Sequence, residues 1–192
     1  MSDNSMTQDC PQDLLAATVE ILRSDDEQGL AQIDDLIADY GRDARLHFLK
    51  GSVLAGLRRY DEAHSAMRRA VEIAPGYTLA RFQYGFLQLT SGDAASAEAT
   101  WAPLHDLPDD DALKLFVRGL SHIARDEFAL GIDLLNRGIA ANSENPPINA
   151  DMRLIIATAE ASVVQGPAED AGPEPLSPTQ LFLQQRLSKT RH

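Results

Sequence analysis

Apolar residues recur three and four positions apart along most of the chain, on both sides of short polar turns. This spacing is typical of amphipathic helices. Between residues 44 and 75 it predicts a first helix over about 45–57 and a second over about 61–73. Pro75 follows, and proline ends a helix because its nitrogen carries no hydrogen to donate. The stretch therefore predicts a helical hairpin.

The same pattern returns every 34 residues. A glycine column, a small-residue column, a large apolar column and a phenylalanine column share this interval. They are Gly51, Gly85 and Gly119; Ala63, Ala97 and Gly131; Met67, Trp101 and Leu135; and Phe48, Phe82 and Phe116. Small residues let two helix axes approach where they cross, so we expect the first two columns to face each other. The register predicts helix pairs over 44–77, 78–111, 112–145 and, in degenerate form, 10–43.

One more helix is expected after the last pair. Asn145-Pro146-Pro147 should break the chain, and Asn149 or Asp151 could cap a helix over about 148–165. Its apolar stripe is Met152, Ile155, Ile156, Ala159 and Val163. We expect this helix to cover the exposed face of the last pair. Outside the helices the sequence predicts a disordered N-terminus (1–9), a Pro-rich linker (166–178) and a short amphipathic segment (179–192).

A 34-residue repeat with an early glycine, an alanine twelve residues later and a large apolar residue four further on resembles the tetratricopeptide repeat family, in its bacterial type. The resemblance implies an all-α, right-handed superhelical solenoid of antiparallel helix pairs, closed by a C-terminal capping helix. Lys50 and Arg118 depart from the pattern, because an apolar residue is usual at that position. In this family the first helix of each pair lines a concave surface that binds partners.

Carried onto this chain, the concave positions form a largely apolar groove. The predicted partner-binding residues are Phe48, Phe82, Phe86, Leu89, Leu113, Phe116, Leu120 and Ile123. An exposed apolar groove with aromatic side chains suits a helix or an extended peptide. Two alternatives stay open: the rings pack against the next repeat, or Leu181, Phe182 and Leu183 fill the groove. The family's carboxylate clamp is not expected, because Phe48, Ser52 and Gln83 stand at its positions.

Composition favours a cytoplasmic protein with a core of single-domain size. The chain has 192 residues, 44% of them hydrophobic, and one cysteine, so no internal disulfide can form. Its first ten residues lack the features of a secretion signal, and no apolar run approaches the length of a membrane span. We interpret Cys10, near a terminus expected to be mobile, as incidental.

Charge is uneven along the chain, whose net charge is −12. Residues 1–43 are strongly acidic, whereas residues 44–76 form a basic island. Its arginines Arg58, Arg59, Arg68 and Arg69 would receive an acidic partner, meet the acidic N-terminal segment of the same chain, or form local ion pairs. Nucleic acid is not expected as a partner, because so acidic a chain repels phosphates.

No catalytic, metal or cofactor motif is recognisable. The five histidines lack metal-ligand spacing, and Asp109-Asp110-Asp111 is better explained as an acidic helix start. The sequence therefore predicts a non-enzymatic adaptor or chaperone that binds an apolar peptide or helix of a protein partner, similar in architecture to the tetratricopeptide chaperones of secretion systems. The alternative is a structural or regulatory module that forms homo-oligomers through its end helices and C-terminal tail.

Overall fold

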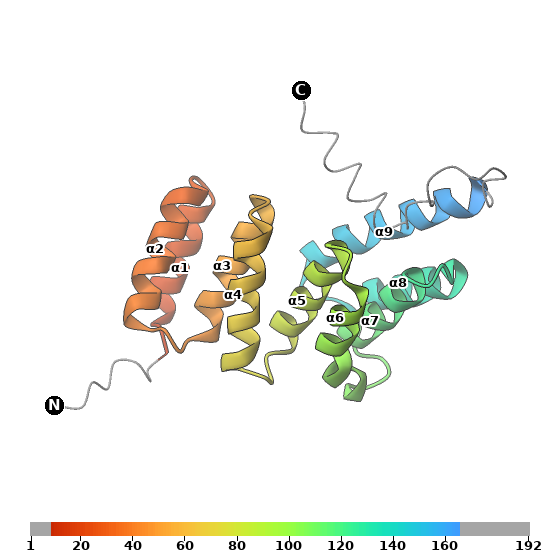
Figure 1. Cartoon of the computed structure of the whole chain (residues 1–192), viewed down its shortest axis with the longest axis horizontal. Coiled ribbons are helices and arrows are strands. Elements are labelled where there is room, and N and C mark those ends of the chain that lie inside the picture. Colours follow the sequence, from red (N-terminus) through yellow and green to blue (C-terminus); the bar gives the residue numbers. More distant parts are fainter. Residues whose placement is uncertain (1–8, 166–192) are drawn as a thin grey trace, which may run out of the picture. The chain divides into compact units, whose positions relative to one another are not determined.

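The computed structural model describes residues 9–165, with side chains up to residue 163 (Figure 1). The helices are α1 (Gln12–Leu22), α2 (Asp26–Asp39), α3 (Ala44–Gly56), α4 (Tyr60–Ile73), α5 (Thr78–Thr90), α6 (Ala94–Trp101), α7 (Ala112–Ile123), α8 (Phe128–Ala141) and α9 (Pro146–Gln165), with a short 3₁₀ helix η2 (Ala102–Asp106) after α6. The predictions made for residues 1–8 and 166–192 lie outside the described residues.

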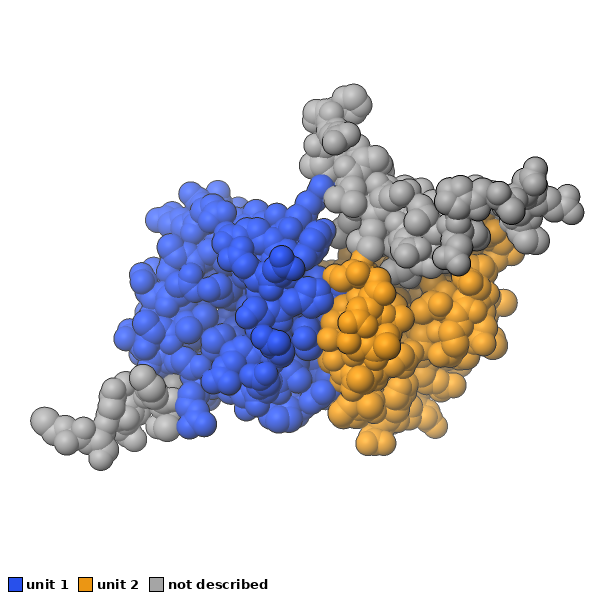
Figure 2. Space-filling view, in the orientation of Figure 1, with its two compact units in different colours: residues 1–87 blue, residues 88–192 orange. Residues whose placement is uncertain are grey.

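The chain forms two compact units, residues 1–87 and 88–192, and their boundary falls within α5 (Figure 2). In the first unit α1 packs on α2, α2 on α3, and α3 on α4. One core cluster joins Leu30 of α2, Leu54 of α3, Met67 of α4 and Leu87 of α5. A second cluster joins Leu15, Leu36 and Leu46 to Cys10.

Close packing of α3 against α4 depends on Gly51. A Cβ at this position would lie 2.5 Å from Met67 Cγ and 3.3 Å from the Ala63 carbonyl oxygen. The expected crossing of the glycine and small-residue columns is therefore confirmed in this hairpin. A larger residue at position 51 would separate the two helices.

In the second unit α7 packs on α8, and α8 packs on α9. Gly119 and Gly131 repeat the close approach, because a Cβ on Gly131 would lie 2.9 Å from the Gly119 carbonyl oxygen. The helix before this pair is short: α6 ends at Trp101, and Pro103 lies in the first turn of η2. Proline cannot donate to an α-helical ladder, so the chain tightens into a 3₁₀ turn there.

Aspartates begin several of the helices. The carboxylates of Asp25, Asp93 and Asp111 accept hydrogen bonds from backbone amides in the first turns of α2, α6 and α7. Such caps satisfy amides that have no partner inside the helix. The interpretation of Asp111 as part of a helix start is confirmed.

In the pairs over 44–77, 78–111 and 112–145, the turn between the two helices uses one residue in the left-handed region. Arg58, Gly92 and Asp126 have φ values of 65°, 89° and 60° and follow one another at intervals of 34 residues. Only the middle one is glycine, the residue for which this conformation costs least. The turn geometry is thus kept where the sequence does not favour it.

The final helix begins earlier than the sequence suggested. Pro146 is the first residue of α9 rather than a break before it, because proline has no amide hydrogen to satisfy in a first turn. Asn149 does not cap the helix: its Oδ1 accepts a hydrogen bond of 2.8 Å from Asn142 Nδ2. Of the expected stripe, Met152, Ile155, Ile156 and Ala159 are buried, whereas Val163 is 57% exposed.

Candidate functional site

The face of the first helices, expected to be an open apolar groove, is largely closed. Five of the eight predicted partner-binding side chains are buried: Phe82 and Phe116 are 0% exposed, and Leu89, Leu120 and Ile123 are 5%, 1% and 2% exposed. Phe48, Phe86 and Leu113 are partly exposed. A binding role for all eight stays a prediction, but only these three offer surface to a partner without rearrangement.

Aromatic rings gather on this face in the first unit. The ring of Phe48 packs edge-on against Tyr77, with centroids 5.3 Å apart. The ring of Phe86 stacks on that of Phe82, with centroids 6.2 Å apart and planes within 5°. Phe82 is fully buried and Phe86 is partly exposed, so the Phe86 ring packs on a side chain that is held in the core. Such rigid aromatic surface loses little entropy when it binds.

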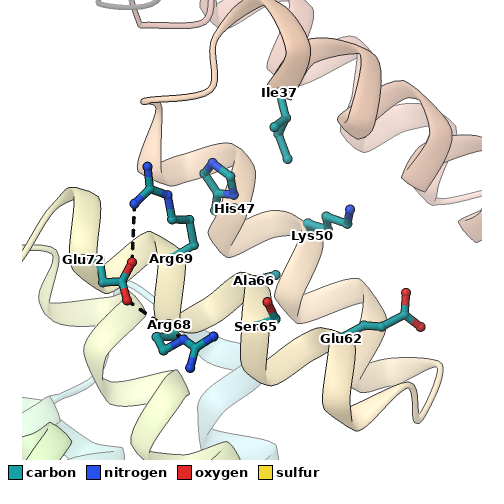
Figure 3. Close-up of a pocket in the computed structure, with 9 residues that line it drawn as sticks. All are labelled: Ile37, His47, Lys50, Glu62, Ser65, Ala66, Arg68, Arg69 and Glu72. Carbon is teal, nitrogen blue, oxygen red and sulfur yellow. Dashed lines mark hydrogen bonds and ion pairs between the residues drawn. The ribbon is translucent and has the colours of Figure 1, made fainter.

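A second candidate is a cleft of about 430 Å³ in the first unit, between α2, α3 and α4 (Figure 3). Its volume lies within the range of sites that hold ligands. The lining residues are Ile37 of α2, His47 and Lys50 of α3, and Glu62, Ser65, Ala66, Arg68, Arg69 and Glu72 of α4. Sequence reasoning identified the basic island but not the cleft, because a cleft between helices of different pairs leaves no periodic signal.

Ion pairs around the cleft use the acidic N-terminal helices. Lys50 Nζ lies 2.5 Å from Asp34 Oδ1, and Arg59 lies 3.5 Å from Glu27 Oε1. Arg59 also forms a 2.7 Å pair with Glu62, and this hydrogen bond lowers the pKa of Glu62. Two of the interpretations offered for the basic island are thus confirmed together: it meets the acidic N-terminal segment, and it forms local ion pairs.

Arg68 and Arg69 both pair with Glu72 of their own helix, not with the N-terminal helices. Arg68 Nε lies 3.9 Å from Glu72 Oε1, and Arg69 Nη1 lies 3.4 Å from Glu72 Oε2 (Figure 3). Both arginine side chains are more than half exposed. Two guanidinium groups therefore share one carboxylate at long distances.

An ion pair between the buried Asp43 and the partly exposed Arg45 holds the start of the described chain against α3. Asp43 caps α3, and its Oδ2 lies 2.6 Å from Arg45 Nη2 and accepts a 2.8 Å hydrogen bond from the Cys10 amide. Arg45 Nη2 also donates to the Cys10 carbonyl at 2.7 Å. Cys10 is 2% exposed, so it is a packed core residue at the start of the described chain.

Burial and hydrogen bonding oppose each other at Asp43. Burial alone would raise the pKa of its carboxyl group, but hydrogen bonds from Arg45 and from the Cys10 amide outweigh it, so the pKa is lowered. Burial raises the pKa of the Cys10 thiol, and the charge of Asp43 adds to this effect. Cys10 therefore stays a thiol at neutral pH, with little thiolate for reaction.

Within residues 9–165, no three His, Cys, Asp or Glu side chains are grouped so that they could hold a metal ion. The helices of that range include none long and apolar enough to cross a membrane.

Comparison with protein families matches residues 44–77 to the tetratricopeptide repeat. The matched segment covers the hairpin α3–α4 and the turn that follows it. The chain therefore contains a tetratricopeptide repeat. Repeats of this family mediate contacts between proteins, so the match supports a protein–protein interaction adaptor. A search of curated proteins finds no match.

Solved structures of similar fold agree with the repeat. Residues 41 to the end of MamA from Desulfovibrio magneticus RS-1 match with a TM-score of 0.56 and 16% identity, over 79% of this chain and 92% of that chain. A MamA RS-1 double mutant, ArsTM, matches with a TM-score of 0.57 and 14% identity, over 93% of this chain and 96% of that chain. At such identities the likeness shows the fold alone: an all-α tetratricopeptide solenoid of antiparallel helix pairs.

Proposed function

We propose that this tetratricopeptide repeat protein is a non-enzymatic adaptor or chaperone of the cytoplasm. It binds an apolar helix or extended segment of a partner protein on the first-helix face of its first unit. The partly exposed rings of Phe48 and Phe86 are the anchors. Cytoplasmic placement rests on the single, unpaired cysteine.

The observation that carries the proposal is the stacked pair of phenylalanines. Phe86 is partly exposed, and its ring stacks on that of the buried Phe82. A partner side chain that packs on Phe86 displaces water from apolar surface and orders no mobile group of this chain. Aromatic residues held in this way are frequent among the residues that dominate interface energies.

The test is an affinity purification from the source cell with matched variants. Phe48→Ser and Phe86→Ser together should lose the partner that the wild-type chain retains, while circular dichroism shows that the double variant is still folded at the temperature of the purification. Leu130→Ser is the control, because Leu130 is 59% exposed and lies on α8 of the second unit. Retention of every partner by the double variant would contradict the proposal.

Exposed apolar side chains on the last helix favour a second candidate, a structural or regulatory module that self-associates. Leu154 and Val163 of α9 are 40% and 57% exposed. A second copy that covers them would remove apolar surface from water. Under this candidate, Leu154→Glu should reduce the mass of an oligomer measured by light scattering. A chain that is monomeric before the substitution would exclude it.

A further inference from the structure

Three surfaces of the described chain lie outside the first-helix face: the cleft between α2, α3 and α4, the exposed face of α9, and the cluster of His122, Arg125 and Glu127. The cluster is exposed and its charges pair with one another. The α9 face carries nothing that points to one occupant beyond the second candidate function. The cleft combines a cavity with unmatched charge, and it uses no residue of the first-helix face.

Charge in the cleft is unbalanced after the internal ion pairs are counted. Lys50 is paired with Asp34, and Glu62 is paired with Arg59, so these groups compensate each other. Among the described residues, Glu72 is the carboxylate within ion-pair distance of Arg68 and Arg69. Two guanidinium groups on one carboxylate leave one positive charge unmatched.

The geometry of the Arg68–Glu72 and Arg69–Glu72 pairs allows another carboxylate to replace Glu72. Their closest distances are 3.9 and 3.4 Å, whereas the Arg59–Glu62 pair is 2.7 Å long. A guanidinium group binds a carboxylate best through two parallel hydrogen bonds. Neither arginine has that arrangement with Glu72, so an incoming carboxylate can form better hydrogen bonds than those present.

The rest of the cleft suits a peptide rather than a bare anion. Ile37 points from α2 toward α4 (Figure 3) and, with Ala66, gives the cleft an apolar part, while Ser65 adds a hydroxyl group. Carboxylates of the same chain already occupy this surface, because Asp34 and Glu27 of α2 reach Lys50 and Arg59. Acidic side chains on a polypeptide are thus compatible with the surroundings of the cleft.

We propose that the cleft between α2, α3 and α4 binds an acidic peptide segment of a partner protein, with Arg68 and Arg69 receiving its carboxylates and Ile37 and Ala66 contacting an apolar side chain beside them. This site goes beyond the proposed function and does not depend on it. A partner could use both surfaces, one for apolar anchors and one for charge.

A defined probe tests the site on the purified full chain. The probe is a fluorescein-labelled peptide, Asp-Glu-Leu-Asp-Glu-Ala, and its control has Asn and Gln in place of the acidic residues. Fluorescence anisotropy should show binding of the acidic peptide, and binding should weaken as salt rises from about 50 to about 300 mM. The amide control should bind at least about tenfold more weakly, since it offers no charge to the guanidinium groups.

Three variants locate the site. Arg68→Ala with Arg69→Ala should raise the Kd about tenfold, whereas Arg23→Ala with Arg42→Ala, which changes the net charge equally in the same unit, should leave it nearly unchanged. Glu72→Gln removes the competing carboxylate and should tighten binding, with Glu20→Gln as its control. Ser65→Trp keeps every charge but fills the cleft, so it should weaken binding. Circular dichroism checks that each variant is folded.

Several results would overturn the proposal. If both double arginine variants weaken binding equally, the peptide binds basic surface in general and not the cleft. Binding that survives Ser65→Trp would place it outside the cleft. Saturation by inorganic phosphate without any binding of the peptide up to about 1 mM would make this an anion site rather than a peptide site. None of these measurements involves Phe48 or Phe86, so their failure is distinct from failure of the proposed function.

Discussion

The hairpins α3–α4 and α7–α8 have the same register, 68 residues apart, but they pack their first helices differently. Phe48 and Phe116 occupy the same position of the repeat, yet Phe48 is partly exposed and Phe116 is 0% exposed. One difference lies on the second helix. A Cβ on Gly138 would lie 2.6 Å from the Phe116 ring, and the first repeat has Ala70 in place of this glycine. Phe116 therefore packs directly on a glycine of α8, a contact that the first repeat does not offer to Phe48.

The two hairpins also differ in the residues at the crossing of their helices. In the first repeat Ala55 packs beside Ala63, whereas the third repeat has Ile123 and Gly131 at these positions. A Cβ on Gly131 would lie 2.6 Å from Ile123 Cδ1. The larger side chain on one helix is accommodated by the smaller residue on the other, as dense packing requires. In the third repeat the larger side chain at the crossing thus stands opposite glycine.

The comparison predicts unequal costs for equal substitutions. Phe116→Ala should lower the free energy of unfolding by about 3–5 kcal/mol, because it leaves a cavity in the core of the second unit. Phe48→Ala should cost only about 1–2 kcal/mol, because its ring is partly in water already. Urea unfolding followed by circular dichroism measures both. Equal losses would mean that the two rings are equally buried in solution.

Asp43 and Asp111 give the next contrast, since they cap α3 and α7 at the same repeat position. Asp111→Ala should cost about 1 kcal/mol, as the loss of a helix cap does. Asp43→Ala should cost about 2–4 kcal/mol, because it also removes the buried partner of Arg45 and of the Cys10 amide. If both substitutions cost the same, the contacts of Asp43 with Arg45 and Cys10 add nothing.

The stability difference between the wild type and Asp43→Ala should change with pH in a defined direction. The folded-state pKa of Asp43 is lowered from 3.8, so the ionised carboxylate stabilises the fold above the unfolded value, and this contribution is lost as pH falls through the folded-state pKa. The gap in stability between the wild type and Asp43→Ala should therefore be constant near neutral pH and shrink below about pH 3.8. A gap that widens in acid would contradict the pairing.

The smallest effect concerns the glycine under Phe116. Gly138→Ala raises helix propensity by about 1 kcal/mol but crowds the ring, so the net result should be a loss of about 1 kcal/mol. In a chain that already carries Phe116→Ala the same substitution should stabilise, because the clash is gone. A double-mutant cycle by urea unfolding measures this reversal of sign. Without the reversal, Gly138 would have no part in burying Phe116.

Helix positions were predictable from the sequence because the period of 34 fixes them. The expected helices over 45–57 and 61–73 lie within one residue of α3 and α4 at each end, and Gly51 marks their crossing as expected. Exposure was less predictable. The concave positions carry apolar side chains in every repeat, but whether a ring is covered depends on residues such as Gly138, which lies 22 residues further along the chain.

The contacts between side chains of different helix pairs could not be predicted from the sequence either. Sequence alone left open whether the basic island meets the acidic N-terminal segment or pairs locally, and the structure contains both. Cys10 is held by hydrogen bonds to Asp43 and Arg45, which lie 33 and 35 residues away. No periodic pattern encodes such a contact, because it joins a loop to a helix cap.

Photo-crosslinking tests the central claim most directly. A benzoylphenylalanine placed in turn at positions 48, 86 and 130 reports which surface a partner touches in the source cell. The account predicts one shared crosslinked partner at positions 48 and 86 and none of it at position 130. The same partner crosslinked at position 130, and not at the two phenylalanine positions, would contradict binding through the first helices.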